Sequence, residues 1–121
     1  MLFLQNMENL RSIVNNFMVI INGSMREDGV SGRLAQALCQ EFSNVKYFSI
    51  RKMDIHFCMA CERCKTASCF WKDDVNEVFQ AWQEAQIIMI LAPVYWGGVP
   101  AKLKALFDRA QGLCRFIEKE D

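Results

Sequence analysis

Four cysteines stand close together in the middle of the chain. Cys58, Cys61, Cys64 and Cys69 lie in the stretch CMACERCKTASC, with two, two and four residues between successive cysteines. Four thiolates in one short loop can bind an iron–sulfur cluster or a zinc ion. In a reducing compartment they can also stay as free thiols, because disulfides are rare there. The spacing therefore predicts a metal-binding or redox-active loop, and these three alternatives stay open.

The neighbours of the cysteines bear on the choice between iron and zinc. A ferredoxin loop has three residues before its last cysteine and a proline after it. Here four residues precede Cys69, and Phe70 follows it. Zinc ribbons usually separate two CxxC pairs by a longer span, although His56 could replace one cysteine as a zinc ligand. We expect His56 to be an ordinary loop residue.

The composition is that of one globular domain. The 121 residues are 52% hydrophobic, and 14 basic residues balance 14 acidic ones. This balance argues against nucleic acid or an anionic membrane as a partner. The opening MLFLQNMENLRS lacks the features of a leader peptide, and the apolar run IIMILAPV is too short to cross a bilayer. We therefore expect a cytoplasmic protein.

The elements that position the cysteine loop follow from the hydrophobic pattern. Apolar runs at 17–21, 45–50 and 87–91 predict buried strands. Ser31 is a candidate N-cap for a first helix, and Asp74 with Glu77 resembles a capping box for a second. Pro100 is placed to open a third. The apolar stripes of the three helices are Leu34, Leu38 and Phe42; Val75, Val78, Phe79 and Trp82; and Leu103, Leu106, Phe107 and Ala110.

The order of these elements predicts an α/β fold with a parallel sheet and helices on both faces. If the third strand lies beside the first, the strand order is 2-1-3 and the direction of winding reverses between them. Ligands bind at such a switch point. The loops at 22–33 and 92–100 would flank it.

The loop at 22–33 has the components of a phosphate site. Its glycines match neither GxGxxG nor the Walker pattern. Hydroxyl groups, free backbone amides and a helix N-terminus would nevertheless suit a phosphate monoester. The candidate residues are Ser24, Arg26, Gly29, Ser31, Gly32 and Arg33. Glu27 and Asp28 must then point away; the alternative is a solvated turn.

The loop at 92–100 carries aromatic residues beside flexible backbone. Tyr95 and Trp96 precede Gly97 and Gly98. Aromatic side chains next to free amides suit a flat ring with a polar edge. The alternative is that both rings pack locally against the third helix.

Three ordered motifs carry a family resemblance. NGSMREDGVSGRLAQAL, CMACERCKTASC followed by DD, and APVYWGGVPAKLKALFDR together resemble the iron–sulfur flavoprotein branch of the NADPH-dependent FMN reductase family, from about Met18 to Arg109. The resemblance implies a flavodoxin-like three-layer sandwich. It also implies an FMN-dependent oxidoreductase, or an electron-transfer protein that moves electrons between NAD(P)H or ferredoxin and an acceptor.

The resemblance also assigns residues to cofactors. It implies that the FMN phosphate is bound by Ser24, Met25, Arg26, Ser31 and Gly32, and that the isoalloxazine ring lies against Pro93, Val94, Tyr95, Trp96 and Gly97. The C-x2-C-x2-C-x4-C spacing of Cys58, Cys61, Cys64 and Cys69 falls within the branch's pattern for a 4Fe-4S cluster. No side chain is expected to act as a catalytic acid, base or nucleophile, because the flavin carries the chemistry.

The family pattern continues beyond the end of this chain. Two further strands of the fold are missing, so residues 18–121 are expected to form a partial flavodoxin-like domain and residues 1–17 an N-terminal extension. The third strand would then be an unprotected sheet edge, which favours a homo-oligomer. Two alternatives to an oxidoreductase remain: a noncatalytic binding module stapled by zinc, and an inactive truncated remnant.

The remaining candidates are expected to be structural. Cys39 and Cys114 should face the core as small hydrophobic residues. Lys104, Asp108 and Arg109 should lie on a solvated helix face or at a subunit contact.

Overall fold

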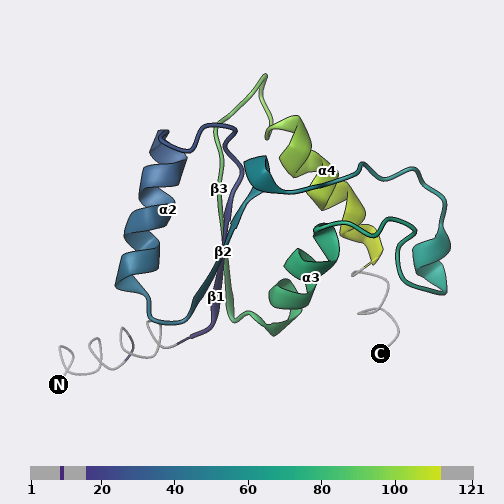
Figure 1. Cartoon of the computed structure of the whole chain (residues 1–121), viewed down its shortest axis with the longest axis horizontal. Coiled ribbons are helices and arrows are strands. Elements are labelled where there is room, and N and C mark those ends of the chain that lie inside the picture. The colour runs from purple at the N-terminus through teal and green to yellow at the C-terminus, as the bar shows by residue number, and fades with distance from the viewer. Residues whose placement is uncertain (1–8, 10–15, 113–121) are drawn as a thin grey trace.

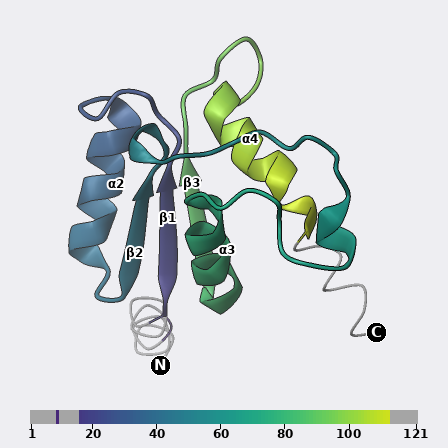
Figure 2. The ribbon, with the colours of Figure 1, turned by 45° about the vertical axis from the view of Figure 1, so that its right-hand side comes forward.

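The computed structural model describes residues 9 and 16–112 and contains a parallel sheet between two helical layers (Figure 1). The strands are β1 (Met18–Asn22), β2 (Val45–Ser49) and β3 (Ile87–Leu91), in the order β2-β1-β3. Figure 2 shows α2 (Val30–Glu41) on one face of the sheet and α3 (Val75–Glu84) and α4 (Ala101–Arg109) on the other. The predicted α/β fold and strand order are confirmed.

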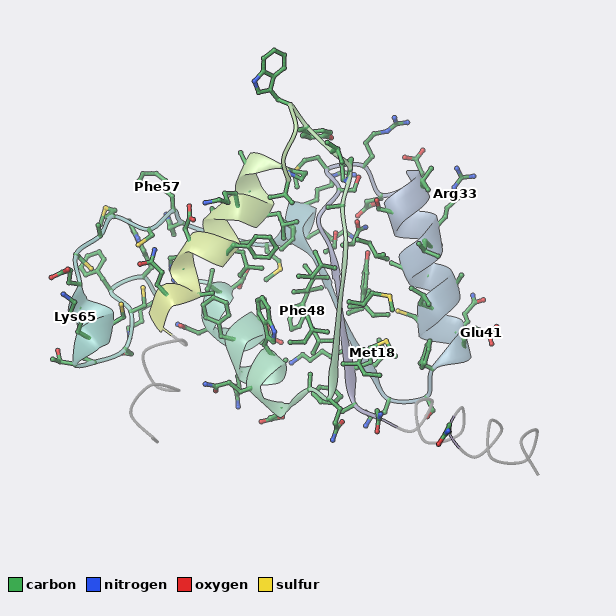
Figure 3. The ribbon with its side chains drawn as sticks, turned by 180° about the vertical axis from the view of Figure 1, so that it is seen from behind. Met18, Arg33, Glu41, Phe48, Phe57 and Lys65 are labelled. Atoms are coloured by element: carbon green, nitrogen blue, oxygen red, sulfur yellow. The ribbon has the colours of Figure 1, made fainter. Side chains whose placement is uncertain are left out.

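The central strand β1 is buried on both faces, as its continuous apolar run predicts. Its side chains alternate between two hydrophobic clusters. Val19 and Ile21 pack with the buried residues of α3 and α4, whereas Met18 and Ile20 pack against α2 through Ala35. Met18 and Phe48 mark the two faces in Figure 3.

The strand register brings the carboxyl ends of all three strands to one edge of the sheet. Asn22 pairs with Ser49 on one side and with Leu91 on the other. The loops that follow β1 and β3 therefore begin side by side (Figure 1). This is the switch point that the predicted strand order requires.

Two predicted helix starts are wrong in detail. Gly29, and not Ser31, is the N-cap of α2, and Ser31 lies in the first turn. Asp74 occupies the N-cap of α3 but makes no side-chain cap hydrogen bond. Its carboxylate instead accepts a hydrogen bond from Asp54 N at 2.6 Å, so the capping box does not form. Pro100 stands immediately before α4, as expected.

The predicted apolar stripes of the helices are largely confirmed. Leu38 and Phe42 of the first stripe pack against the sheet, but Leu34 is 48% exposed. The small Ala35 takes the central position of that helix face, which brings α2 close to the strands. Cys39 packs beside it, and burial raises the pKa of its thiol. Cys114 lies outside the described residues, as does nearly all of the predicted extension at 1–17.

The cysteine segment is a long connection between β2 and α3. It contains only two short 3-10 turns, η1 (Ile50–Lys52) and η2 (Arg63–Lys65). Figures 1 and 2 show it passing α4 and projecting away from the sheet, on the side opposite α2. Phe57 and Lys65 mark this projection in Figure 3. Within the described part of the chain, no helix is long and apolar enough to cross a membrane.

Candidate functional site

The loop after β1 is fixed by hydrogen bonds to its own residues. Asn22 is buried at the end of the strand, and its Oδ1 accepts a hydrogen bond from Ser24 N at 3.1 Å. Ser24 is 6% exposed, and its Oγ accepts a hydrogen bond from Arg26 N at 3.0 Å. On the other side, Asn22 Nδ2 donates to Tyr47 Oη of β2 at 3.1 Å. The chain therefore leaves the strand along a defined path.

The same loop lies tightly against the start of α2. A Cβ atom added at Gly32 would lie 2.0 Å from the carbonyl oxygen of Glu27, so only glycine fits there. The Glu27 carboxylate pairs with Lys52 Nζ at 2.7 Å, and this hydrogen bond and charge lower the pKa of Glu27. The carboxylate of Glu27 thus points to Lys52 of η1, as a phosphate site in this loop requires.

The predicted phosphate residues surround this turn. Ser24 is buried, Met25 packs against the core, Arg26 is exposed, and Ser31 and Gly32 open α2. The first amides of a helix have no partner within the helix. A buried hydroxyl, a close-packed glycine and these amides together fit a phosphate group.

The loop after β3 forms a tight hairpin turn. Tyr95 N donates to Gly98 O at 2.8 Å, and Gly98 N donates to Tyr95 O at 3.0 Å. Trp96 and Gly97 between them have positive φ angles of 49° and 75°. Trp96 is fully exposed and Val94 is 79% exposed. The alternative in which Tyr95 and Trp96 both pack on the third helix is therefore wrong for Trp96.

The two loops are joined where they leave the sheet. Gly23 N donates to Leu91 O at 2.7 Å. A Cβ atom at Gly23 would lie 2.6 Å from a side-chain carbon of Leu103, so α4 also packs closely against this point. The loop with the phosphate-type residues and the loop with the exposed rings therefore begin at adjacent strand ends.

The four cysteines line one cavity of about 410 Å³ between the cysteine segment, one face of α3 and the C-terminal end of α4. Cys58 and Cys61 are exposed, and Cys64 and Cys69 are half-buried. In the described residues no three His, Cys, Asp or Glu side chains are close enough together to hold a single metal ion. The four thiols are instead spread around the cavity that they share. This donor set, four thiols on one cavity, fits a sulfur-ligated cluster, each of whose irons takes one thiolate.

A buried ion pair holds the two ends of the cysteine segment, His56 and Asp73, against Arg109 of α4. We call this junction the neck. Arg109 Nη1 and Nη2 donate to the two oxygens of Asp73 at 2.6 and 2.9 Å, and both side chains are at most 2% exposed. Asp73 also accepts hydrogen bonds from His56 N at 2.9 Å and Val75 N at 3.3 Å. Arg109 Nη1 further donates to His56 O. The expectation that Arg109 lies on a solvated helix face is wrong.

The pair shifts the pKa of both groups. Burial favours the neutral acid of Asp73, but hydrogen bonds from Arg109 and the His56 amide hold its pKa below the ordinary value. Burial likewise opposes the charged guanidinium of Arg109, but Asp73 and, to a smaller extent, Cys69 raise its pKa. Both groups are therefore charged in the folded protein at neutral pH.

Trp71 adds a second fixed group to the cavity wall. Its ring stacks on His56 with centroids 4.0 Å apart and planes 7° apart, and it meets Phe70 edge-on at 5.3 Å. His56 is a loop residue, as expected, and stands next to Asp54 at 3.6 Å.

Sequence reasoning missed Asp73, Arg109 and Trp71 as residues of this region. One signal was present: Arg109 follows Leu106 by three positions, so it continues the buried face of α4. Nothing in the local pattern separates Asp73 from its neighbour Asp74.

Comparison with known proteins agrees with this arrangement. The family described as NADPH-dependent FMN reductase matches residues 18–117. Two iron–sulfur flavoproteins of Methanocaldococcus jannaschii are 36% and 35% identical over 98 residues, or 77% of this chain and 50% and 51% of theirs. An iron–sulfur flavoprotein of Archaeoglobus fulgidus is 35% identical over 97 residues, 77% of this chain and 50% of its own. The chain thus spans about half the length of these relatives. No solved structure matches.

Proposed function

The chain belongs to the NADPH-dependent FMN reductase family, and on that premise we propose that it is an electron-transfer flavoprotein that binds FMN at the switch point and a four-iron cluster at its four cysteines. The observation that carries the proposal is the Gly23–Leu91 hydrogen bond, which brings the loops after β1 and β3 together at one edge of the sheet. Flavin redox chemistry is the general role of this family.

The residues of the first loop would bind the phosphate of FMN. Ser24 and Ser31 offer hydroxyls, Gly32 allows close approach of the backbone, and Arg26 offers a positive charge from the surface. Met25 holds the loop to the core. Engagement of Glu27 by Lys52 removes one negative charge from the path of the phosphate.

The second loop would position the flavin ring. Pro93 would contact the ring, and the amides of Val94, Trp96 and Gly97 would face its polar edge, while Val94, Tyr95 and Trp96 offer apolar surface that is now exposed to solvent. Covering that surface with a flat ring would remove it from water, which favours binding.

Cys58, Cys61, Cys64 and Cys69 would hold the cluster. Support comes from the single cavity that all four line and from the printed name of the relatives, iron–sulfur flavoprotein. FMN would supply the redox chemistry and the cluster single-electron transfer. Electrons would come from NAD(P)H or ferredoxin, and β3, one of the two outer strands of the described sheet, would favour a homo-oligomer.

The test is the visible absorption spectrum of the protein purified without oxygen, with iron, sulfide, zinc and flavin analysis of the same sample. Flavin bands above a broad sulfur-to-iron shoulder are expected. Zinc without iron would favour a zinc-stapled binding module. Neither metal nor flavin, even after reconstitution with both, would refute the proposal and favour an inactive remnant.

A pair of variants assigns the metal to the loop. Cys64→Ala is expected to lose the iron, because it removes one thiol of the cavity. Cys39→Ala serves as the control, because Cys39 lies on α2, packs against the sheet and does not line the cavity. Equal iron content in the two variants would contradict the assignment.

A further inference from the structure

Two buried nitrogen atoms beside the four cysteines have no hydrogen-bond partner. They are Trp71 Nε1 and Arg109 Nε, the two such side-chain atoms in the described part of the chain. Both residues line the cavity that Cys58, Cys61, Cys64 and Cys69 also line. Buried polar groups are nearly always paired in a working protein, so each of these donors requires an explanation.

Neither donor is free to turn toward another partner. The guanidinium of Arg109 is held by Asp73 through Nη1 and Nη2, and by His56 O through Nη1, whereas its Nε donates to no described protein atom. The indole of Trp71 is held between the stacked ring of His56 and the edge of Phe70. Both N–H groups therefore belong to fixed side chains that line the cavity, and neither has an acceptor among the described residues.

The four cysteines identify the acceptor that would complete the site. A cluster bound by four thiolates brings anionic sulfur into the cavity, and N–H groups donate to such sulfurs. Charge and hydrogen bonding from Cys69 already contribute to the raised pKa of Arg109, so the guanidinium lies near that sulfur. The charge of the guanidinium is balanced by Asp73, so the remaining contribution of Arg109 is a directed N–H group.

We propose that Trp71 and Arg109 are positioning residues whose Nε1–H and Nε–H groups donate hydrogen bonds to the sulfur atoms of a cluster held by the four cysteines, and so raise its reduction potential. The inference rests on the proposed function, because it requires the cluster. Reduction adds one electron to the cluster and makes its sulfurs more negative. Hydrogen bonds to sulfur therefore stabilise the reduced form more than the oxidised one.

The test uses Trp71→Phe, which keeps an aromatic ring against His56 and removes the N–H group. Trp82→Phe is the matched control, because Trp82 packs against the core on α3 and does not line the cavity. The measurement is the midpoint potential of the cluster in the anaerobic protein, from a redox titration followed by electron paramagnetic resonance. Iron content is measured on the same samples.

We expect Trp71→Phe to make the cluster about tenfold harder to reduce, a potential lower by about 59 mV for a one-electron couple. Trp82→Phe should keep the wild-type potential. A potential in Trp71→Phe equal to that of the wild type, at equal iron content, would overturn the assignment of Trp71. A wild-type protein without iron would instead overturn the proposed cluster and this inference with it.

Arg109→Lys provides the second measurement. It keeps the positive charge for Asp73 but removes the Nε–H group from the wall, so its potential should also fall. If Trp71→Phe does not hold iron, the midpoint potential of Arg109→Lys tests whether side-chain N–H groups raise the potential of the cluster. A merely structural role of Arg109 would alter unfolding and leave the potential unchanged, and that result would refute its assignment.

Discussion

The loop after β1 and the cysteine segment differ in what fixes their shape. The first is held along its length: Asn22, Ser24 and Arg26 are linked in series by hydrogen bonds, and Gly32 packs against the backbone of Glu27. The second is held at its ends. Asp54 N donates to Asp74, and Asp73 binds His56 N and Arg109, while most of the residues between are exposed.

This difference indicates how each site reaches its working geometry. The phosphate loop is completed by the fold, so its ligand meets a preformed surface. The cysteine segment has a closed neck and an open interior. We therefore expect its interior to be ordered by what the thiols bind, as in other metal sites whose ligands come together on binding.

The largest expected effect comes from opening the neck. Asp73→Asn leaves the buried Arg109 without its counter-charge, and we expect the free energy of unfolding to fall by about 3–5 kcal/mol. Urea denaturation measures this change. Asp74→Asn, at the exposed neighbouring carboxylate, is the control and should cost less than about 1 kcal/mol. Equal losses in the two variants would show that the neck does not depend on the buried pair.

The phosphate loop can be disrupted by one methyl group. In Gly32→Ala the Cβ would meet the Glu27 carbonyl at 2.0 Å, and the backbone must move. We expect a loss of about 1–3 kcal/mol in unfolding free energy and weaker FMN binding in a fluorescence titration. Gly29→Ala is the control in the same loop, because its nearest neighbour is 3.5 Å away. Similar FMN affinity in both variants would contradict a preformed loop.

Acid should weaken the neck selectively. The pKa of Asp73 is lower in the folded protein than in the unfolded chain, so its carboxylate stabilises the fold above its ordinary pKa of about 3.9. That stability is lost as the pH falls from there through the lowered folded value. Wild type should therefore lose up to about 1.4 kcal/mol more per pH unit than Asp73→Asn in this range. Urea midpoints from about pH 5 to about pH 2 test it, and parallel curves would refute it.

The exposed tip of the loop after β3 should contribute to FMN binding and not to the stability of the fold. Trp96 is fully exposed, so Trp96→Ala should change the unfolding free energy by less than about 0.5 kcal/mol. Loss of ring contact should weaken FMN binding by about tenfold. Phe70→Ala, an exposed ring of the cysteine segment, should leave FMN affinity unchanged. Equal flavin affinity in the two variants would mean that the flavin ring does not bind at the loop after β3.

The smallest effect is expected at the other ion pair of α4. Lys104 pairs with Asp108 across one helical turn, with both side chains well exposed. Lys104→Gln should cost no more than about 0.5 kcal/mol. A cost near that of Asp73→Asn would mean that burial does not separate the two pairs. Thermal unfolding of both variants in one buffer makes the comparison direct.

The sequence predicted the sheet well because the strands are local patterns. The runs at 17–21, 45–50 and 87–91 lie within a residue of β1, β2 and β3. The order 2-1-3, which required that the third strand lie beside the first, is confirmed. The cysteine loop and the two loops at the switch point were also predicted. The assignment of Ser24, Ser31 and Trp96 to FMN stays a prediction.

The neck could not be predicted because its partners are far apart in sequence. Asp73 and Arg109 are separated by 36 positions, and no local pattern states that their side chains meet. Asp74 matched a capping box by spacing, but the backbone entering α3 directs Asp73 to Val75 N instead. Whether a side chain caps a helix depends on the backbone conformation just before the helix. Here that conformation is set by the contacts of Asp74 with Asp54 and of Asp73 with Arg109.

The placement of the tryptophans gives each compared region its own optical label. Trp71 lies against an imidazole at the wall of the cysteine cavity, whereas Trp96 stands in solvent on the loop after β3. A water-soluble quencher such as iodide will reach the second indole and be kept from the first. Emission lost to the quencher therefore follows coverage of the flavin loop. Emission that resists it comes from Trp71 and from Trp82, which packs against the core, so closure around the cysteines is followed in Trp82→Phe.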